Sequence, residues 1–246
     1  MTNTPWDALS RTWLHTCEPD HAGWILHPLE TASSVAFVVV ALAIWHDTRT
    51  TRHEHNARSL APIVGCIGVA SALFHASLRT LFHIVDVAAI GPLTAYFVTA
   101  VFIHRGRVSP GSHWRVAIPL ALVGVAAPVV HLGLGFVTIA AQGLVVLWLW
   151  PRGGPRQVAG RRPDTKTAIG DIPRAAGYLL PGVFLLALDH GGIGCLRGAF
   201  AHVVQPHAVW HVLSAMGLWH LYRAECRLES DWGSTEGRSA PPSTVA

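Results

Sequence analysis

The sequence predicts an all-α membrane protein, a bundle of seven transmembrane helices. Of its 246 residues, 51% are hydrophobic and only 13% are charged, and the mean hydropathy is +0.38. This composition is too apolar and too poor in charge for a soluble domain of this size. The charged groups gather in short polar segments between apolar runs of roughly 15–25 residues, the length that a helix needs to cross a bilayer.

The apolar runs set the expected domain organisation. We expect spans at residues 31–45, 60–78, 81–103, 175–188 and 206–223, and two more within 116–150. The segment 116–150 has 35 residues without a charge, which is too long for one span. Pro128 and the pair Gly133 and Gly135 near His131 predict a break there. Residues 1–30 then form an N-terminal segment, 31–225 the membrane domain and 226–246, rich in Ser, Gly and Pro, a disordered tail.

Basic residues in the loops predict the orientation of the bundle. Fifteen of the 18 Lys and Arg residues fall in one alternate set of loops, and the other set holds only Arg11, Arg79 and Arg197. The positive-inside rule puts the richer set, with the C-terminus, in the cytoplasm and the N-terminus outside. The net charge of +4 does not indicate a nucleic-acid partner, because no basic run is interleaved with exposed aromatic residues.

Two histidines at the start of the last span are candidate metal ligands. His207 and His211 stand one helical turn apart, so their imidazoles can converge on one metal ion. Pro206 suits the first turn of such a helix. With 16 histidines in the chain, chance alone predicts about one pair with this spacing. Both could also be helix-end histidines that face the lipid headgroups.

Three further polar residues inside spans fall at the same depth. Ser71 and His75 are four residues apart near the outer end of the second span, and Asp86 lies near the outer end of the third. Ionisable groups inside spans are costly and indicate function by default. Three imidazoles, His75 with His207 and His211, form the usual protein part of a catalytic zinc site, which leaves one position open for water.

Structural interpretations of the same residues stay open. Ser71 alone is typical of a small helix-packing residue that bonds to its own helix. Asp86 could instead be a structural partner of His83, three residues before it. Four histidines have no assigned partner and are interpreted as interfacial or packing residues: His83, His190, His202 and His220.

These motifs together resemble the alkaline ceramidase family and its bacterial relatives. The resemblance lies in Ser71-Ala-Leu-Phe-His75, in Asp86 eleven residues after the histidine, and in His207-Ala-Val-Trp-His211. The family belongs with the adiponectin receptors and the hemolysin III-like proteins in a superfamily of seven-transmembrane metal hydrolases. The resemblance extends from about residue 17 to 216, and the pair Cys17-Glu18 resembles the family's start.

The resemblance implies a role for each of these residues. His75, His207 and His211 would bind zinc, Asp86 would be the general base, and Ser71 would hydrogen-bond the water or the developing oxyanion. The implied activity is that of a zinc-dependent hydrolase in sphingolipid metabolism, which cleaves the N-acyl amide bond of a ceramide-like lipid taken from the bilayer. The implied location is a bacterial inner membrane, with the active site toward the external side.

Functions of other classes remain as alternatives. One is a non-catalytic seven-span receptor or sensor with a structural zinc. Asp86 and Ser71 beside the three histidines favour catalysis over it, because a structural zinc would need a fourth protein ligand. Another is a transporter, against which the sequence shows no inverted repeat and no matching pair of interrupted spans.

The N-terminal segment departs from the family pattern. The eukaryotic alkaline ceramidases have a calcium site there, and Glu18, Asp20 and Glu30 are the acidic candidates for a reduced version of it. His27 falls where the family has a Glu, and Glu30 falls where an Asn is expected. Calcium prefers oxygen ligands, and a neutral imidazole is a poor substitute. A calcium ion, a softer metal and no metal at all remain open for this second site.

Two loop cysteines fall on the same side of the predicted bundle. Cys17 and Cys195 both belong to the external set of loops. That side is oxidising in a bacterium, so a disulfide between the N-terminal segment and the last external loop is expected, with two unpaired cysteines as the alternative.

Overall fold

The computed structural model describes residues 9–12, 16–50, 55–150, 165–196, 200, 201 and 203–236. Its regular elements in these ranges are all helices, apart from one isolated bridge between Arg11 and Arg79, so the predicted all-α class is confirmed. The helices are α1 (Pro28–Thr50), α2 (His55–Arg58), α3 (Leu60–Ser77), α4 (Thr80–His104), η1 (Pro110–Ser112), α5 (His113–Val130), α6 (Leu132–Leu149), α7 (Thr165–His190) and α8 (Pro206–Glu236).

Six helical segments in the described chain are long and apolar enough to cross a membrane, which makes this a multi-pass membrane protein. They are Pro28–Thr50, Asn56–Ser77, Thr80–His104, Pro110–Val130, Leu132–Leu149 and Gly170–His190. The expected break at His131 is confirmed, because α5 ends at Val130 and α6 begins at Leu132. Helix α8, the expected seventh span, is not among the six.

Helix α8 differs from the expectation in length. It continues to Glu236, so residues 226–236 are helical where a disordered tail was expected, and the rest of that segment lies outside the described residues. It packs against α7 and α1, which places it inside the bundle despite its lower hydropathy.

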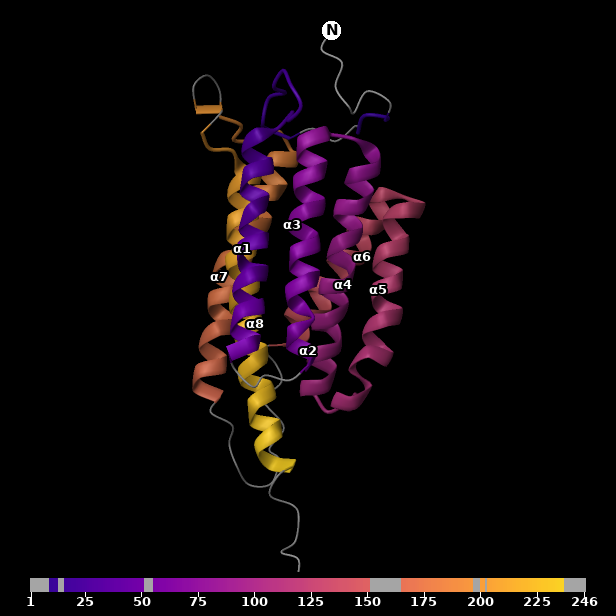
Figure 1. The fold of residues 1–246 in the computed structure, drawn as a ribbon, viewed down its shortest axis with the longest axis vertical. Helices are drawn as coiled ribbons and strands as arrows, with labels where there is room; N and C mark the ends of the chain where they lie inside the picture. The colour runs from indigo at the N-terminus through magenta and orange to yellow at the C-terminus, as the bar shows by residue number, and fades with distance from the viewer. Residues whose placement is uncertain are drawn as a thin grey trace, which may run out of the picture.

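The helices form a series in space (Figure 1). Helices α8, α1, α3 and α4 are neighbours in that order, α7 lies against α8, and α5 and α6 lie against α4. Helices α4 and α5 approach closely at Gly91 and Gly124, where a Cβ added to Gly91 would lie 2.7 Å from the carbonyl carbon of Gly124. Small residues permit such close approach between membrane helices.

The N-terminal segment is anchored to the turn between α3 and α4. The N–H of Leu26 donates to the carbonyl of Ala76 (2.9 Å), and the N–H of His27 donates to that of His75 (3.1 Å). Leu78 adopts the left-handed conformation (φ 53°) that ends α3 and turns the chain into α4. The start of α1 is therefore held beside the end of α3, at the end of the bundle where α8 begins (Figure 1).

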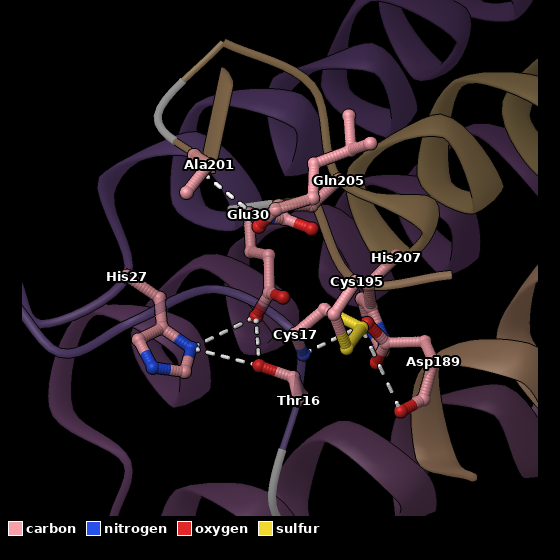
Figure 2. The surroundings of a disulfide bond; sticks show 10 residues. Thr16, Cys17, His27, Glu30, Asp189, Cys195, Ala201, Gln205 and His207 are labelled. Carbon is pink, nitrogen blue, oxygen red and sulfur yellow. Dashed lines mark hydrogen bonds and ion pairs between the residues drawn. A yellow bond between two sulfur atoms is a disulfide. The ribbon is translucent and has the colours of Figure 1, made fainter. Parts of the chain in front are cut away.

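The expected disulfide between Cys17 and Cys195 is confirmed. It links the N-terminal segment to the chain that follows α7 (Figure 2). The backbone N–H of Cys17 also donates to Asp189 Oδ1 (2.9 Å), near the C-terminus of α7. The disulfide and this hydrogen bond thus attach the N-terminal segment to α7 and to the loop that follows it.

Polar pairs tie α8 to its neighbours at the opposite end. The hydroxyl of Tyr222 donates to Asp47 Oδ2 on α1 (2.7 Å), and His104 Nε2 on α4 lies 2.8 Å from Glu225 Oε2. Buried polar groups usually need such partners because an unpaired one is costly.

Candidate metal centre

Three buried histidines from two helices meet at the disulfide-linked end of the bundle. His75 comes from the last turn of α3, and His207 and His211 come from the first two turns of α8. The ring centroid of His75 lies 4.8 Å from that of His207 and 5.0 Å from that of His211. The ring centroids of His207 and His211 are 4.8 Å apart. One nitrogen from each ring lies within 4.8 Å of the other two, so the three rings could hold one metal ion.

In two of the histidines a carboxylate lies beside Nδ1 and so favours Nε2 as the nitrogen available to a metal ion. Nδ1 of His75 lies 2.8 Å from Glu30 Oε2, and Nδ1 of His207 lies 3.1 Å from Asp189 Oδ2. The contact of His207 is a hydrogen bond to a carboxylate, which only accepts, so its Nδ1 carries the hydrogen and its Nε2 keeps its lone pair. The contact of His75 lacks hydrogen-bond geometry, but the negative charge beside its Nδ1 favours the hydrogen on that nitrogen as well.

A serine determines the tautomer of the third histidine. Ser33 Oγ donates its hydrogen to the carbonyl of Glu30 (2.9 Å) and lies 2.8 Å from His211 Nδ1. Because that hydroxyl has one hydrogen, its oxygen accepts from Nδ1–H of His211. All three rings therefore keep an Nε2 lone pair for a ligand.

The donor set fits a zinc ion. Nε2 of His75 is fully buried and has no hydrogen-bond partner among the described residues, and leaving a buried polar atom unpaired costs about 1–3 kcal/mol. Zinc is commonly bound by histidine nitrogens whose other ring nitrogen donates to a carboxylate or another acceptor, as here. No fourth His, Cys, Asp or Glu of the described chain joins this group.

Ser71 borders the same space. Its Oγ lies 3.4 Å from His211 Nε2 and 3.0 Å from Ser34 Oγ. Ser34 donates its hydrogen to the carbonyl of Glu30 (2.9 Å), so it accepts from Ser71 in this arrangement. The Ser71 hydroxyl therefore bonds across to α1 and lies beside His211 Nε2, beyond the contacts of a residue that only packs its own helix.

Asp86 has an unpaired carboxylate. It makes no hydrogen bond or ion pair with any residue that the structure describes, and it lies close enough to His207 for their charges to interact. His83, its alternative partner, instead places Nδ1 3.0 Å from Thr12 Oγ1 and stacks on Phe74 with ring centroids 4.4 Å apart. His83 therefore does not engage Asp86, whose charge interacts with that of His207.

The other unassigned histidines also have contacts. His83 is buried rather than interfacial. His220 lies 3.2 Å from Asp171 Oδ1, and the ring of His190 lies 5.8 Å from that of His207. His202 lies outside the described residues.

Sequence reasoning missed the residues that support the ligands. Asp189 is the one acidic residue between Asp171 and Glu225 in the sequence, at the end of an apolar run, and that isolation was the available signal. Ser33 follows Glu30 by three residues and so shares its helix face, which was a weaker signal. Figure 2 shows Glu30 and Asp189 on either side of the disulfide, near His207.

The four candidates for a second metal site are engaged in different contacts. Both carboxylate oxygens of Glu18 accept from backbone N–H groups in the first turn of α1, those of Leu29 and Glu30, each at 2.8 Å. This caps a helix N-terminus, where unpaired N–H groups and the helix dipole favour an anion. Only His27 and Glu30 fall within one possible metal-binding group, and they share it with His75.

A histidine links the remaining carboxylates of that segment. Nδ1 of His27 lies 3.0 Å from Glu30 Oε2, and Nε2 lies 3.2 Å from Asp20 Oδ1. Burial acts to lower the pKa of His27, but the hydrogen bond to Glu30 and the charges of Glu30 and Glu18 raise it overall. Asp20 also pairs with Arg11, which lowers the pKa of Asp20 against the effect of burial. When protonated, the His27 imidazole between these two carboxylates supplies positive charge where a cation would otherwise bind.

No family model and no curated protein sequence matches this chain. What the site can do therefore follows from its own chemistry. Three imidazoles place one nitrogen each within 4.8 Å of the other two, the charge of an unpaired carboxylate interacts with one of them, and a hydroxyl lies beside them. This combination suits a metal-assisted hydrolysis, in which a water and a carbonyl oxygen both need a nearby positive charge.

Replacing the carboxylate behind His207 should weaken metal binding. In Asp189→Asn the side chain keeps its shape but loses the charge that makes His207 a stronger ligand. We expect zinc affinity to fall about 10- to 100-fold, measured by competition with a chelator of known affinity. Asp47→Asn, at the other end of the bundle, is the matched control and should leave the affinity unchanged. Equal affinities in wild type and Asp189→Asn would show that Asp189 does not support the ligand.

Proposed function

We propose that this chain is a zinc-dependent integral membrane hydrolase that cleaves the N-acyl amide bond of a ceramide-like lipid to a sphingoid base and a fatty acid. The observation that carries the proposal is the set of three buried histidines whose Nδ1 atoms are each held by a different side chain, with Asp86 unpaired beside them. The spacing of these residues, which resembles that of the alkaline ceramidases, supports the choice of reaction.

Each residue has a chemical role in this proposal. His75, His207 and His211 would hold zinc, which when bound lowers the pKa of a water toward ~7 and polarises a carbonyl. The Asp86 carboxylate would take a proton from the attacking water and pass it to the leaving nitrogen as the carbon–nitrogen bond breaks, a contribution of typically about 10²–10⁴-fold. The Ser71 hydroxyl would hydrogen-bond the carbonyl oxygen on which negative charge develops.

The position of the site supports a lipid substrate. The histidines lie where α3 ends and α8 begins, at the end of helices long enough to cross the bilayer. The amide bond of a ceramide-like lipid lies at the corresponding depth, between the headgroup layer and the acyl chains. A long-chain substrate would therefore reach the site without leaving the membrane.

The orientation belongs to the same proposal. Helix α8 would be a seventh span, with the N-terminus and the metal centre on the external side of a bacterial inner membrane and the C-terminus in the cytoplasm. The excess of basic residues in the loops at the other end supports this orientation. The disulfide between Cys17 and Cys195 also supports it, because disulfides persist on the oxidising side.

A sensor with a structural zinc is the competing function. Structural zinc sites use four protein ligands, whereas catalytic sites use three and leave a position for water. The group of three histidines with no fourth ligand in the described chain favours catalysis. Asp86 favours it as well, because a structural site has no use for an unpaired carboxylate.

Measuring metal content and fatty acid release together tests the proposal. The purified full-length protein should hold about one zinc per chain and release fatty acid from one or more members of a panel of ceramides of different acyl length. Matched O-acyl esters in the panel distinguish an amidase from an esterase, and mass spectrometry of the released acid gives the rate. One zinc per chain without any acid released would contradict hydrolysis and favour the sensor.

A further inference from the structure

Several basic side chains surround a buried carboxylate at the end of the bundle opposite the metal centre. Asp171 on α7 is 0% exposed. Its Oδ1 lies 3.2 Å from His220 Nδ1 and 3.4 Å from an Arg174 nitrogen. Its Oδ2 pairs with Arg227 and lies 4.0 Å from Arg223 Nε.

Three guanidinium groups face the single carboxylate of the cluster, and two of them, those of Arg174 and Arg223, are open to the surroundings. The side chains of Arg174 and Arg223 are 64% and 43% exposed, and neither makes another hydrogen bond or ion pair within the described chain. Each guanidinium has five N–H donors in a planar fork, and such a fork matches the oxygens of a phosphate.

The cluster lies at the depth of a headgroup layer. The apolar segment of α7 begins at Gly170, one residue before Asp171. On α8, Arg223 follows His207 by 16 residues, which corresponds to about 24 Å along a helix axis. The hydrocarbon core of a bilayer is about 30 Å thick. If the metal centre lies near one membrane surface, Arg223 lies near the other.

The surface of α7 next to the cluster is open to lipid. Within the described chain α7 packs chiefly against α8, so its other faces are uncovered. Leu180 and Phe184, deeper in the span than Arg174, are exposed apolar side chains on this helix. Acyl chains can lie against these side chains while a headgroup reaches the guanidiniums.

We propose that Arg174 and Arg223 bind the phosphate of an anionic phospholipid in the leaflet at this end of the bundle. Asp171, which His220 contacts, positions the two guanidiniums, and their positive charge selects a headgroup with net negative charge over a zwitterionic one. Basic pockets between membrane helices recognise anionic headgroups through the same interactions. This site is independent of the metal centre and of its proposed reaction.

Native mass spectrometry of the delipidated full-length protein tests the site. We expect phosphatidylglycerol to bind at least tenfold more tightly than phosphatidylcholine with the same acyl chains. Arg174→Gln/Arg223→Gln should abolish that preference, and Arg174→Lys/Arg223→Lys should retain part of it, because lysine keeps the charge but loses the planar fork. Thermal unfolding followed by tryptophan fluorescence establishes that each variant is folded.

Matched controls decide the outcome. Arg107→Gln/Arg115→Gln removes two exposed arginines that follow α4 and begin α5, and it should leave the preference unchanged. An unchanged preference in folded Arg174→Gln/Arg223→Gln, or an equal loss in the control, would overturn the site. Inorganic phosphate that binds as tightly as the lipid would assign the guanidiniums to a free anion and overturn the lipid. The lysine variant keeps the test valid if the glutamine variant does not fold.

Discussion

Asp86→Asn should keep zinc and lose turnover. The amide is nearly isosteric with the carboxylate but cannot accept a proton, so the acid–base steps lose their catalyst. We expect fatty acid release to fall by about 10²–10⁴-fold. Zinc content should stay at one per chain, because Asp86 is not one of the three residues whose nitrogens converge.

The measurement combines metal analysis with the rate of acid release from the best substrate of the panel. Asp47→Asn is the control, because Asp47 accepts a hydrogen bond from Tyr222 that an asparagine oxygen can also accept. It should retain both zinc and rate. Turnover near the wild-type level in Asp86→Asn would exclude Asp86 as the base and leave the proton transfer without an assigned residue.

Removing both α8 histidines should eliminate the metal. His207→Ala/His211→Ala leaves one of three nitrogen ligands, and Asp189 and Ser33 lose the rings that they hold. We expect zinc to fall from about one per chain to background, and hydrolysis to disappear with it. Inductively coupled plasma mass spectrometry of the purified variant gives the zinc content.

A double variant of exposed histidines is the control for that loss. His46→Ala/His131→Ala removes the same number of imidazoles from positions exposed to the surroundings, so it should keep zinc. Zinc retained in His207→Ala/His211→Ala, or absent from wild type, would refute the metal centre. Removing zinc from wild type with a chelator and restoring it should abolish and recover hydrolysis, which separates loss of metal from damage to the fold.

The helical class, the break at His131 and the Cys17–Cys195 pairing could all be predicted from the sequence. Each depends on local or side-specific information: hydropathy along the chain, proline and glycine at a break, and the loop to which a cysteine belongs. The common depth of His75, Asp86 and His207 also followed from helix order and spacing alone. Zinc and hydrolysis remain predictions, because they depend on a bound ion and a reaction.

The details of the site could not be predicted in the same way. Glu30, a candidate ligand of a second metal, falls with His27 and His75 in one possible metal-binding group, and its contact with the Nδ1 atom of His75 was not foreseen. Glu18 was a candidate for the same metal, but it caps α1. Both outcomes depend on how far the N-terminal segment folds back over the bundle, which hydropathy and spacing do not encode.

The sequence by itself thus determined which residues reach the same membrane depth and which cysteines share a side, because both depend on position along the chain. Only the tertiary structure decided that Asp189 and Ser33 contact the Nδ1 atoms of His207 and His211, and that these two rings meet His75. The physical reason is that the rotation of each helix about its own axis decides which way its side chains point. Side chains at equal depth meet only if their helices face one another, and packing between α1, α3, α7 and α8 sets that rotation.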